Sequence, residues 1–176
     1  MDCKRITDPD RDLINAFIKE HWFTTTMIIR GREIDMTRVE GFYFSEGHSV
    51  TGLLTYMVYD HILEITSLDS IRENQGTGSR LLEAVRQEAR DRGCQKIVLI
   101  TTNDNIHAIR FYQKRGFDMV RLFHNSIEAS RKLKPEIPLI GDNDIPLRHE
   151  IEFEMDVPAP DPAPSFIVLN PSIPPC

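Results

Sequence analysis

The sequence predicts a mixed α/β domain, in which an antiparallel meander leads into a parallel βαβ unit. Two observations predict this fold. Short β-rich runs separated by turn residues follow a first amphipathic segment, as expected of antiparallel strands. A second amphipathic segment then leads to a continuously apolar, β-branched run, which is typical of a crossover helix and a strand buried on both faces.

The first half of the chain begins with a predicted helix over Asp10–Trp22, because Leu13, Ile14, Phe17 and Ile18 recur at helical spacing. The strands expected after it are Thr25–Ile29, Gly41–Ser45, Val50–Tyr59 and His61–Leu68, with turns at Glu46-Gly47 and Asp60. We therefore expect these strands to pair consecutively.

The second half alternates helices and strands. We expect helices at Ser79–Arg92, at Asn105–Arg115 with Asn105 or Asp104 as N-cap, and at Ser126–Leu133, and strands at Ile97–Ile100, from Phe117 and at Ile151–Val157. Gly93 and Gly116 are expected to end the first two of these helices.

Composition limits the class of protein. The 176 residues suffice for one domain, here expected over 1–157, followed by a tail over 158–176 that holds seven of the eleven prolines. A net charge of -6 argues against binding along nucleic acid. No apolar stretch is long enough to span a membrane, and three cysteines without CxxC spacing indicate neither a disulfide framework nor a zinc site. We expect a cytoplasmic protein without metal, for which a homodimer is one expected state.

The most informative segment is the glycine loop Gln75-Gly76-Thr77-Gly78-Ser79, between a predicted strand and a predicted helix. Glycines at such a turn let backbone N-H groups converge on a ligand, and the helix N-terminus adds partial positive charge. This geometry favours a diphosphate.

Two other diphosphate-binding motifs do not match the loop. A P-loop would need a lysine after the glycines, and a dinucleotide fingerprint would need a third glycine where Leu81 stands. A tight turn that binds nothing remains open from the residues alone.

Two motifs together resemble the GNAT superfamily of N-acetyltransferases. The first, Q/R-x-x-G-x-G/A, matches at Gly76-Thr77-Gly78, although its first position falls on Glu73 and the nearby Arg72 is displaced by one residue. The second, N-x-x-A-x-x-F-Y-x-x-x-G-F, matches from Asn105 to Phe117.

The resemblance implies a GNAT fold whose two central parallel strands splay apart near Leu68 and Thr101, and acetyl-CoA as acyl donor. The cofactor-binding residues it implies are Ser67, Leu68, Asn74, Gln75, Gly76, Thr77, Gly78, Ser79, Asn105, Ala108 and Tyr112. The acceptor would be an amine of a small molecule or peptide.

For the chemistry, the resemblance places the Tyr112 hydroxyl near the sulfur, as the acid for the departing thiolate. We nominate Glu64 as the base, acting through water, with Asp69 as second choice. Trp22, Phe23, Met27 and Ile28 could line an acceptor pocket or pack in the core, and His61 and His107 are expected at the surface. A catalytically silent acyl-CoA-binding module is the alternative function.

Overall fold

The structure is a computed structural model that describes residues 2–29, 31–71 and 75–158. In chain order the strands are β1 (Lys4–Arg5), β2 (Thr26–Ile29), β3 (Arg32–Asp35), β4 (Glu40–Glu46), β5 (Ser49–Tyr59), β6 (Ile62–Ser70), β7 (Lys96–Thr102), β8 (Asp118–Phe123) and β9 (Glu150–Asp156). The helices are α1 (Arg11–Trp22), α2 (Thr77–Asp91), α3 (Ile106–Gln113) and α4 (Ser126–Leu133), with 3-10 turns at Asp8–Asp10 and Asp142–Asp144.

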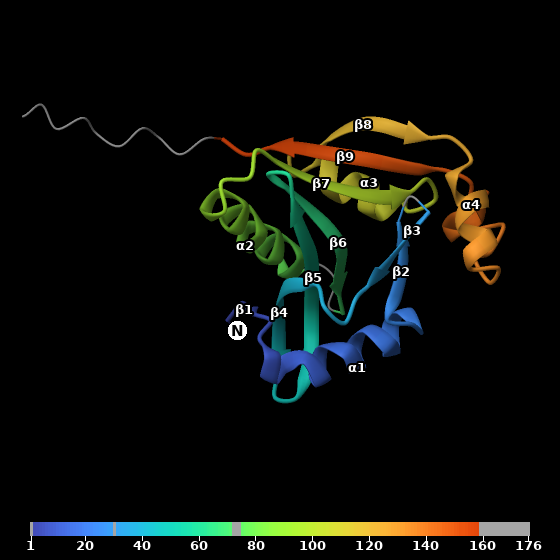
Figure 1. The fold of residues 1–176 in the computed structure, drawn as a ribbon. Helices are drawn as coiled ribbons and strands as arrows, with labels where there is room; N and C mark the ends of the chain where they lie inside the picture. Colours follow the sequence, from blue (N-terminus) through green and yellow to red (C-terminus); the bar gives the residue numbers. More distant parts are fainter. Residues whose placement is uncertain (1, 30, 72–74, 159–176) are drawn as a thin grey trace, which may run out of the picture.

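A seven-stranded sheet in the order β1-β4-β5-β6-β7-β9-β8 organises the chain (Figure 1). Strands β4, β5 and β6 form the predicted antiparallel meander, and α2 then crosses over to β7, which pairs parallel to β6. The mixed α/β fold predicted from the sequence is confirmed.

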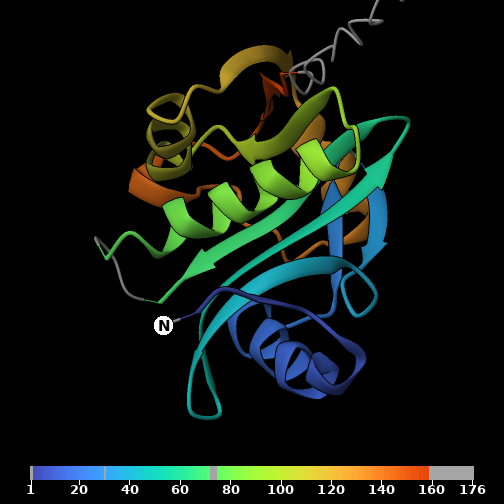
Figure 2. The ribbon, with the colours of Figure 1, turned by 90° about the vertical axis from the view of Figure 1, so that its left-hand side faces the viewer.

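Helices cover both faces of the sheet, with α1 and α2 on opposite sides (Figure 2). Helix α2 buries Leu81, Leu82 and Val85 in a core that also holds Tyr112 and Phe153. Helix α1 buries its own apolar stripe, Ile14, Phe17 and Ile18, in a second core on the other face. Each stripe was visible in the sequence because its residues recur at helical spacing.

The sheet opens between β6 and β7. The two strands pair from Ile62–Lys96 to Ile65–Leu99 and then separate. Beyond that point β6 continues alongside β5, and β7 alongside β9. A β-bulge marks the start of the gap, because Tyr56 of β5 pairs with Ile65 whereas Thr55 pairs with Ser67. Bulges bend a strand and increase its twist, which turns β6 away from β7. The expected splay near Leu68 and Thr101 is therefore present.

Strands β2, β3 and β9 differ from the sequence-based expectation. Strand β2 does not join the meander but forms a separate hairpin with β3, through a turn in which Gly31 has a φ of +70°. Strand β3 was missed because Arg32, Glu33 and Asp35 leave Ile34 as its one apolar residue. Strand β9, for which the sequence predicted no place in the sheet, inserts between β7 and β8, and no local pattern specifies that position.

Candidate active site

The glycine loop forms the first turn of helix α2. The helix begins at Thr77, two residues earlier than predicted, because Gly76 takes a left-handed conformation (φ +76°) that serves as N-cap. The first hydrogen bond of the helix runs from the Arg80 N-H to the Gly76 carbonyl. The N-H groups of the first turn therefore have no partner within the helix and carry the positive end of its dipole.

Helix α3 packs against this turn. A Cβ on Gly78 would lie 3.2 Å from two ring atoms of Phe111, so the glycine permits close approach of the two helices. Arg115 connects them further. Its guanidinium donates to the Ser79 hydroxyl at 2.6 Å and to the Phe111 carbonyl at 2.9 Å, and lies 3.5 Å from the centroid of the Phe111 ring. A cation therefore sits beside the N-terminus of α2.

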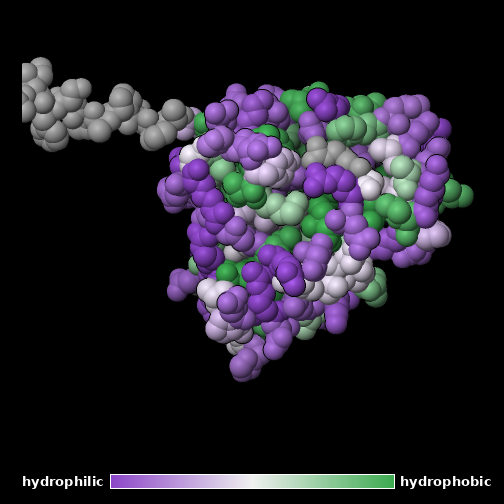
Figure 3. Space-filling view, in the orientation of Figure 1, coloured by the Kyte–Doolittle hydropathy of each residue, from purple (hydrophilic) through white to green (hydrophobic). Residues whose placement is uncertain are grey.

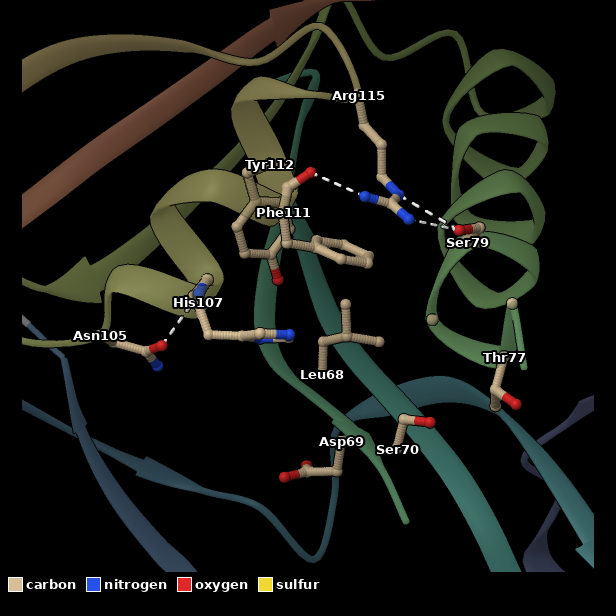
Figure 4. Close-up of a pocket in the computed structure, with 13 residues that line it drawn as sticks. Leu68, Asp69, Ser70, Thr77, Ser79, Asn105, His107, Phe111, Tyr112 and Arg115 are labelled. Carbon is tan, nitrogen blue, oxygen red and sulfur yellow. Dashed lines mark hydrogen bonds between the residues drawn. The ribbon is translucent and has the colours of Figure 1, made fainter. Parts of the chain in front are cut away.

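A cavity of about 360 Å³ extends from this helix N-terminus to the gap between β6 and β7 (Figure 4). We call it the donor cavity. It is lined by Leu68, Asp69, Ser70, Gly76, Thr77, Gly78, Ser79, Asn105, His107, Ala108, Phe111, Tyr112 and Arg115. One end is rich in N-H groups and holds Arg115, which suits a diphosphate, and the other is more apolar. These residues fit the phosphates and arm of an acyl-CoA.

A second cavity of about 280 Å³ lies at the gap itself, and we call it the splay cavity. It shares Leu68, Asn105, Ala108 and Tyr112 with the donor cavity. Its other lining residues come from the end of α1, from β2, from the separated parts of β6 and β7, and from Glu150 of β9. The two cavities thus meet where the parallel strands part.

Tyr112 stands at this junction. The residue is 6% exposed, its ring packs edge-on against Phe111 and Phe117, and its hydroxyl points into the cavity in Figure 4. Burial, with a smaller contribution from the charge of Asp69, raises the pKa of Tyr112 well above its ordinary value. The phenol therefore stays protonated at neutral pH and can donate a proton.

Asp69 lies at the edge of the donor cavity and accepts a hydrogen bond from the Trp22 indole N-H at 3.3 Å. Desolvation by burial raises the pKa of this carboxyl, although the Trp22 bond opposes the shift. A carboxylate with a raised pKa is a stronger base than an exposed one.

Glu64, the first-choice base, lines neither cavity. It is 1% exposed, and its carboxylate accepts a hydrogen bond from the Tyr59 hydroxyl at 2.8 Å. It lies in the part of β6 that is still paired with β7, opposite Val98, so the closed sheet separates it from the gap. Contact with a reacting group would require a chain of water molecules.

The other residues predicted to bind the cofactor differ in which cavity they line. Eight of them line the donor cavity: Leu68, Gly76, Thr77, Gly78, Ser79, Asn105, Ala108 and Tyr112. Ser67 lines the splay cavity instead, with its hydroxyl 2.8 Å from that of Thr55. Gln75 is exposed and lines neither cavity, whereas Asn74, Glu73 and Arg72 lie outside the described residues. Asn105 is the N-cap of α3, where its side chain accepts from the Ala108 N-H at 2.9 Å.

Sequence reasoning missed Arg115, Phe111, Ser70 and Glu150 as lining residues. Helical spacing could have found Phe111, which lies four residues after His107 on α3. Arg115 continues the same four-residue spacing in the turn that follows the helix. His107 is exposed, as expected, yet it also lines the donor cavity. Of the aromatic and apolar run, Trp22, Met27 and Ile28 line the splay cavity, while Phe23 is 91% exposed.

None of the helices described in 2–29, 31–71 and 75–158 is long and apolar enough to cross a membrane. Within the same ranges, no three His, Cys, Asp or Glu side chains are grouped so that they could hold a metal ion.

Comparison with known proteins places this site in a family. The model of the acetyltransferase (GNAT) family matches residues 12–117. The uncharacterized protein YxbD of Bacillus subtilis (strain 168) is 45% identical over 142 residues, which cover 80% of this chain and 89% of YxbD. The uncharacterized protein YdhI of the same organism is 42% identical over 144 residues, covering 81% of this chain and 90% of YdhI.

Solved structures share the fold. An IAA acetyltransferase from Bacillus cereus ATCC 14579 is similar with a TM-score of 0.63 at 22% identity, covering 88% of this chain and 98% of that one. A Bacillus subtilis acetyltransferase in complex with CoA has a TM-score of 0.63 at 18% identity, covering 88% and 97%. A GNAT family acetyltransferase from Elizabethkingia anophelis with acetyl-CoA bound has a TM-score of 0.61 at 20% identity, also covering 88% and 97%. The chain therefore belongs to the GNAT family of acetyltransferases.

Proposed function

We propose that this protein transfers the acetyl group of acetyl-CoA to a primary amine by direct attack. One observation carries the proposal: the donor and splay cavities meet at the gap between β6 and β7 and share Leu68, Asn105, Ala108 and Tyr112. A donor held along α2 and an acceptor entering through the splay cavity would meet at that junction. Holding two reactants in one geometry lowers the entropic part of the barrier. That CoA or acetyl-CoA is bound in two of the similar structures supports the choice of donor.

The Leu68 N-H is our candidate for stabilising the oxyanion. The Ile71 N-H donates to the Thr51 carbonyl of β5. Because N-H directions alternate along a strand, the Leu68 N-H points away from β5, toward the gap. A backbone donor fixed in that direction would stabilise negative charge as it develops on the thioester oxygen.

We assign Tyr112 as the acid that protonates the departing CoA thiolate. The hydroxyl is protonated at neutral pH, and its place at the junction of the two cavities would put it beside both reactants. In the proposed step a base takes a proton from the amine, the nitrogen forms the new amide bond and the C-S bond breaks. The thiolate takes a proton from Tyr112, which recovers one from solvent.

Two carboxylates of β6 compete as the base that removes the proton from the amine. The geometry favours Asp69, because it lines the donor cavity and contacts Trp22 of the splay cavity. Glu64 would act through water from the closed part of the sheet. Asp69→Asn and Glu64→Gln separate them: loss of the acidic limb of the pH profile of kcat/KM in only one variant identifies the base.

Isothermal titration with acetyl-CoA tests the donor, and thiol release with a panel of amines tests the transfer. Binding together with amine-dependent release supports the proposal. Binding without release from any amine would identify a catalytically silent acyl-CoA-binding module. A folded protein that binds neither acetyl-CoA nor CoA would overturn both.

A further inference from the structure

A third cavity continues from the splay cavity. It measures about 280 Å³ and is enclosed by α1, β2 and the segment that follows α4, and we call it the apolar groove. Its residues are Ile18, Trp22, Thr24, Thr26, Met27, Ile28, Met36, Lys134, Glu136 and Ile137. It shares Trp22, Met27 and Ile28 with the splay cavity, so one wall serves both. The three cavities form a series that begins at the helix N-terminus and ends at this groove.

The chemistry of the lining changes along this series. The donor cavity presents N-H groups, hydroxyls and Arg115. The groove is lined mainly by aliphatic, thioether and indole side chains, with two threonines and the oppositely charged Lys134 and Glu136. The surrounding surface is mostly hydrophilic in Figure 3, with hydrophobic side chains gathered across the middle of the face. A concave apolar lining of this kind gains free energy from burying apolar ligand surface.

We infer that the acceptor is a primary amine carried on an apolar chain or ring, with its nitrogen in the splay cavity and its apolar part in the groove. The inference rests on the proposed function, because it assigns the amine to that same site. The path between the two positions passes Trp22, Met27 and Ile28.

The splay cavity also indicates that the acceptor has no carboxylate next to its amine nitrogen. Glu150, 3% exposed, lines this cavity on the side of β9. Its carboxylate attracts an ammonium group and repels a second carboxylate in a setting of low dielectric. An amine without a carboxylate on the neighbouring carbon therefore fits better than the corresponding α-amino acid.

Two readouts test the inference on the full chain. Thiol release from acetyl-CoA measures turnover with ethylamine, butylamine and hexylamine, and with phenethylamine against phenylalanine. Fluorescence of Trp22, the one tryptophan of the chain, reports amine binding without any turnover, because this residue lines both the splay cavity and the groove. We expect kcat/KM to rise about fourfold for each methylene group that becomes buried. We expect phenylalanine to react about a hundredfold more slowly than phenethylamine.

Variants on opposite walls of the apolar groove test whether the groove causes the rise of kcat/KM with amine chain length. Ile28→Asp changes β2 and Ile137→Asp changes the segment after α4, and both residues are partly exposed, so the fold should tolerate either charge. Each variant should abolish the rise of kcat/KM with each added methylene group. Leu122→Asp is the matched control, an exposed apolar residue of β8 that lines none of the three cavities, and it should leave the gain intact.

The outcomes separate this inference from the proposed function. If acetyl-CoA binds and amines react, but without preference for longer chains or with the preference intact in both groove variants, the inference fails and the proposed function stands. If acetyl-CoA does not bind, the proposed function fails. In that case the chain-length dependence of Trp22 fluorescence, and its loss in the groove variants, would show only that the groove binds apolar amines, and the assignment of an acceptor would fall with the proposed function.

Discussion

Two regions at opposite ends of helix α2 shift the pKa values of buried acidic groups in opposite directions. At the outer end of the helix, the Glu88 carboxylate accepts hydrogen bonds from Arg5, Arg92 and the Tyr56 hydroxyl, and the Arg5 bond does most to lower its pKa, to about 2. At the cavity end, burial raises the pKa of Asp69 and of Tyr112. The first arrangement stabilises the ionised form and the fold, whereas the second disfavours the charged form of each group, a kind of shift that is common at functional sites.

This difference predicts a division of effects. Changes around Glu88 should lower stability without changing the reaction, and changes at the cavity end should alter binding or turnover without unfolding the protein. Four substitutions, in descending order of expected effect, test the division.

Tyr112→Phe should lower kcat about a thousandfold, because it removes the proton donor while keeping the buried ring. Steady-state thiol release measures the loss, and calorimetric binding of acetyl-CoA should stay within about twofold of the wild type. Tyr43→Phe is the matched control, since the Tyr43 hydroxyl donates to Asp10 at 2.9 Å and lines neither the donor nor the splay cavity. Equal loss in both variants would argue against Tyr112 as the acid.

Glu88→Gln should lower the free energy of unfolding at pH 7 by about 3 kcal/mol, because Arg5 and Arg92 lose a buried ionic partner. The folded-state pKa of Glu88 is lowered, so its contribution is complete above the ordinary value of 4.5 and is lost as the pH falls through about 2. Urea unfolding at several pH values should show the two proteins converging at the acid end. Glu83→Gln, exposed on the same helix, is the control and should have little effect at any pH.

Arg115→Gln should weaken CoA binding about tenfold, because it removes the cation beside the N-terminus of α2. The control Arg110→Gln removes an exposed arginine of α3, the helix just before Arg115, that does not line the donor cavity. Calorimetry with CoA and with pantetheine, which lacks the diphosphate, distinguishes a contact between Arg115 and phosphate from a structural role of Arg115. Equal weakening for both ligands would indicate a structural role for Arg115 rather than a contact with phosphate.

Asp69→Asn should raise Tm at pH 7 by roughly 2 °C while activity falls. The folded-state pKa of Asp69 is raised, so its stabilising effect is complete below the unfolded pKa and is lost as pH rises through the folded value. Asparagine imitates the protonated form, and the two proteins should therefore be equally stable near pH 3. A lower Tm at pH 7 would show that the contact with Trp22 outweighs the cost of burying the charge.

Local sequence patterns predicted most of the helices and strands, because residue spacing and capping side chains within each segment determine them. Helices α1 and α2 follow from apolar residues at helical spacing, and Asn105 is identifiable as a cap because a short polar side chain precedes a helix. The glycine loop and the segment from Asn105 to Phe117 likewise indicated the family and most of the donor cavity. The limits of the domain at 157 and of the tail at 158–176 stay predictions.

The features that the sequence did not predict depend on contacts between residues that are distant in sequence. Glu64 looked suitable as a base from its strand position, but only strand pairing shows that it lies where β6 and β7 are still joined. Arg115 reaches Ser79 across 36 positions, and Glu150 reaches the splay cavity because β9 inserts between β7 and β8. The sequence by itself determined the helices, the meander and most of the glycine-loop and α3 residues that line the donor cavity, since these depend on spacing and backbone conformation. Which charged side chains line the cavities was decided by the tertiary structure, because strand order and packing place them there.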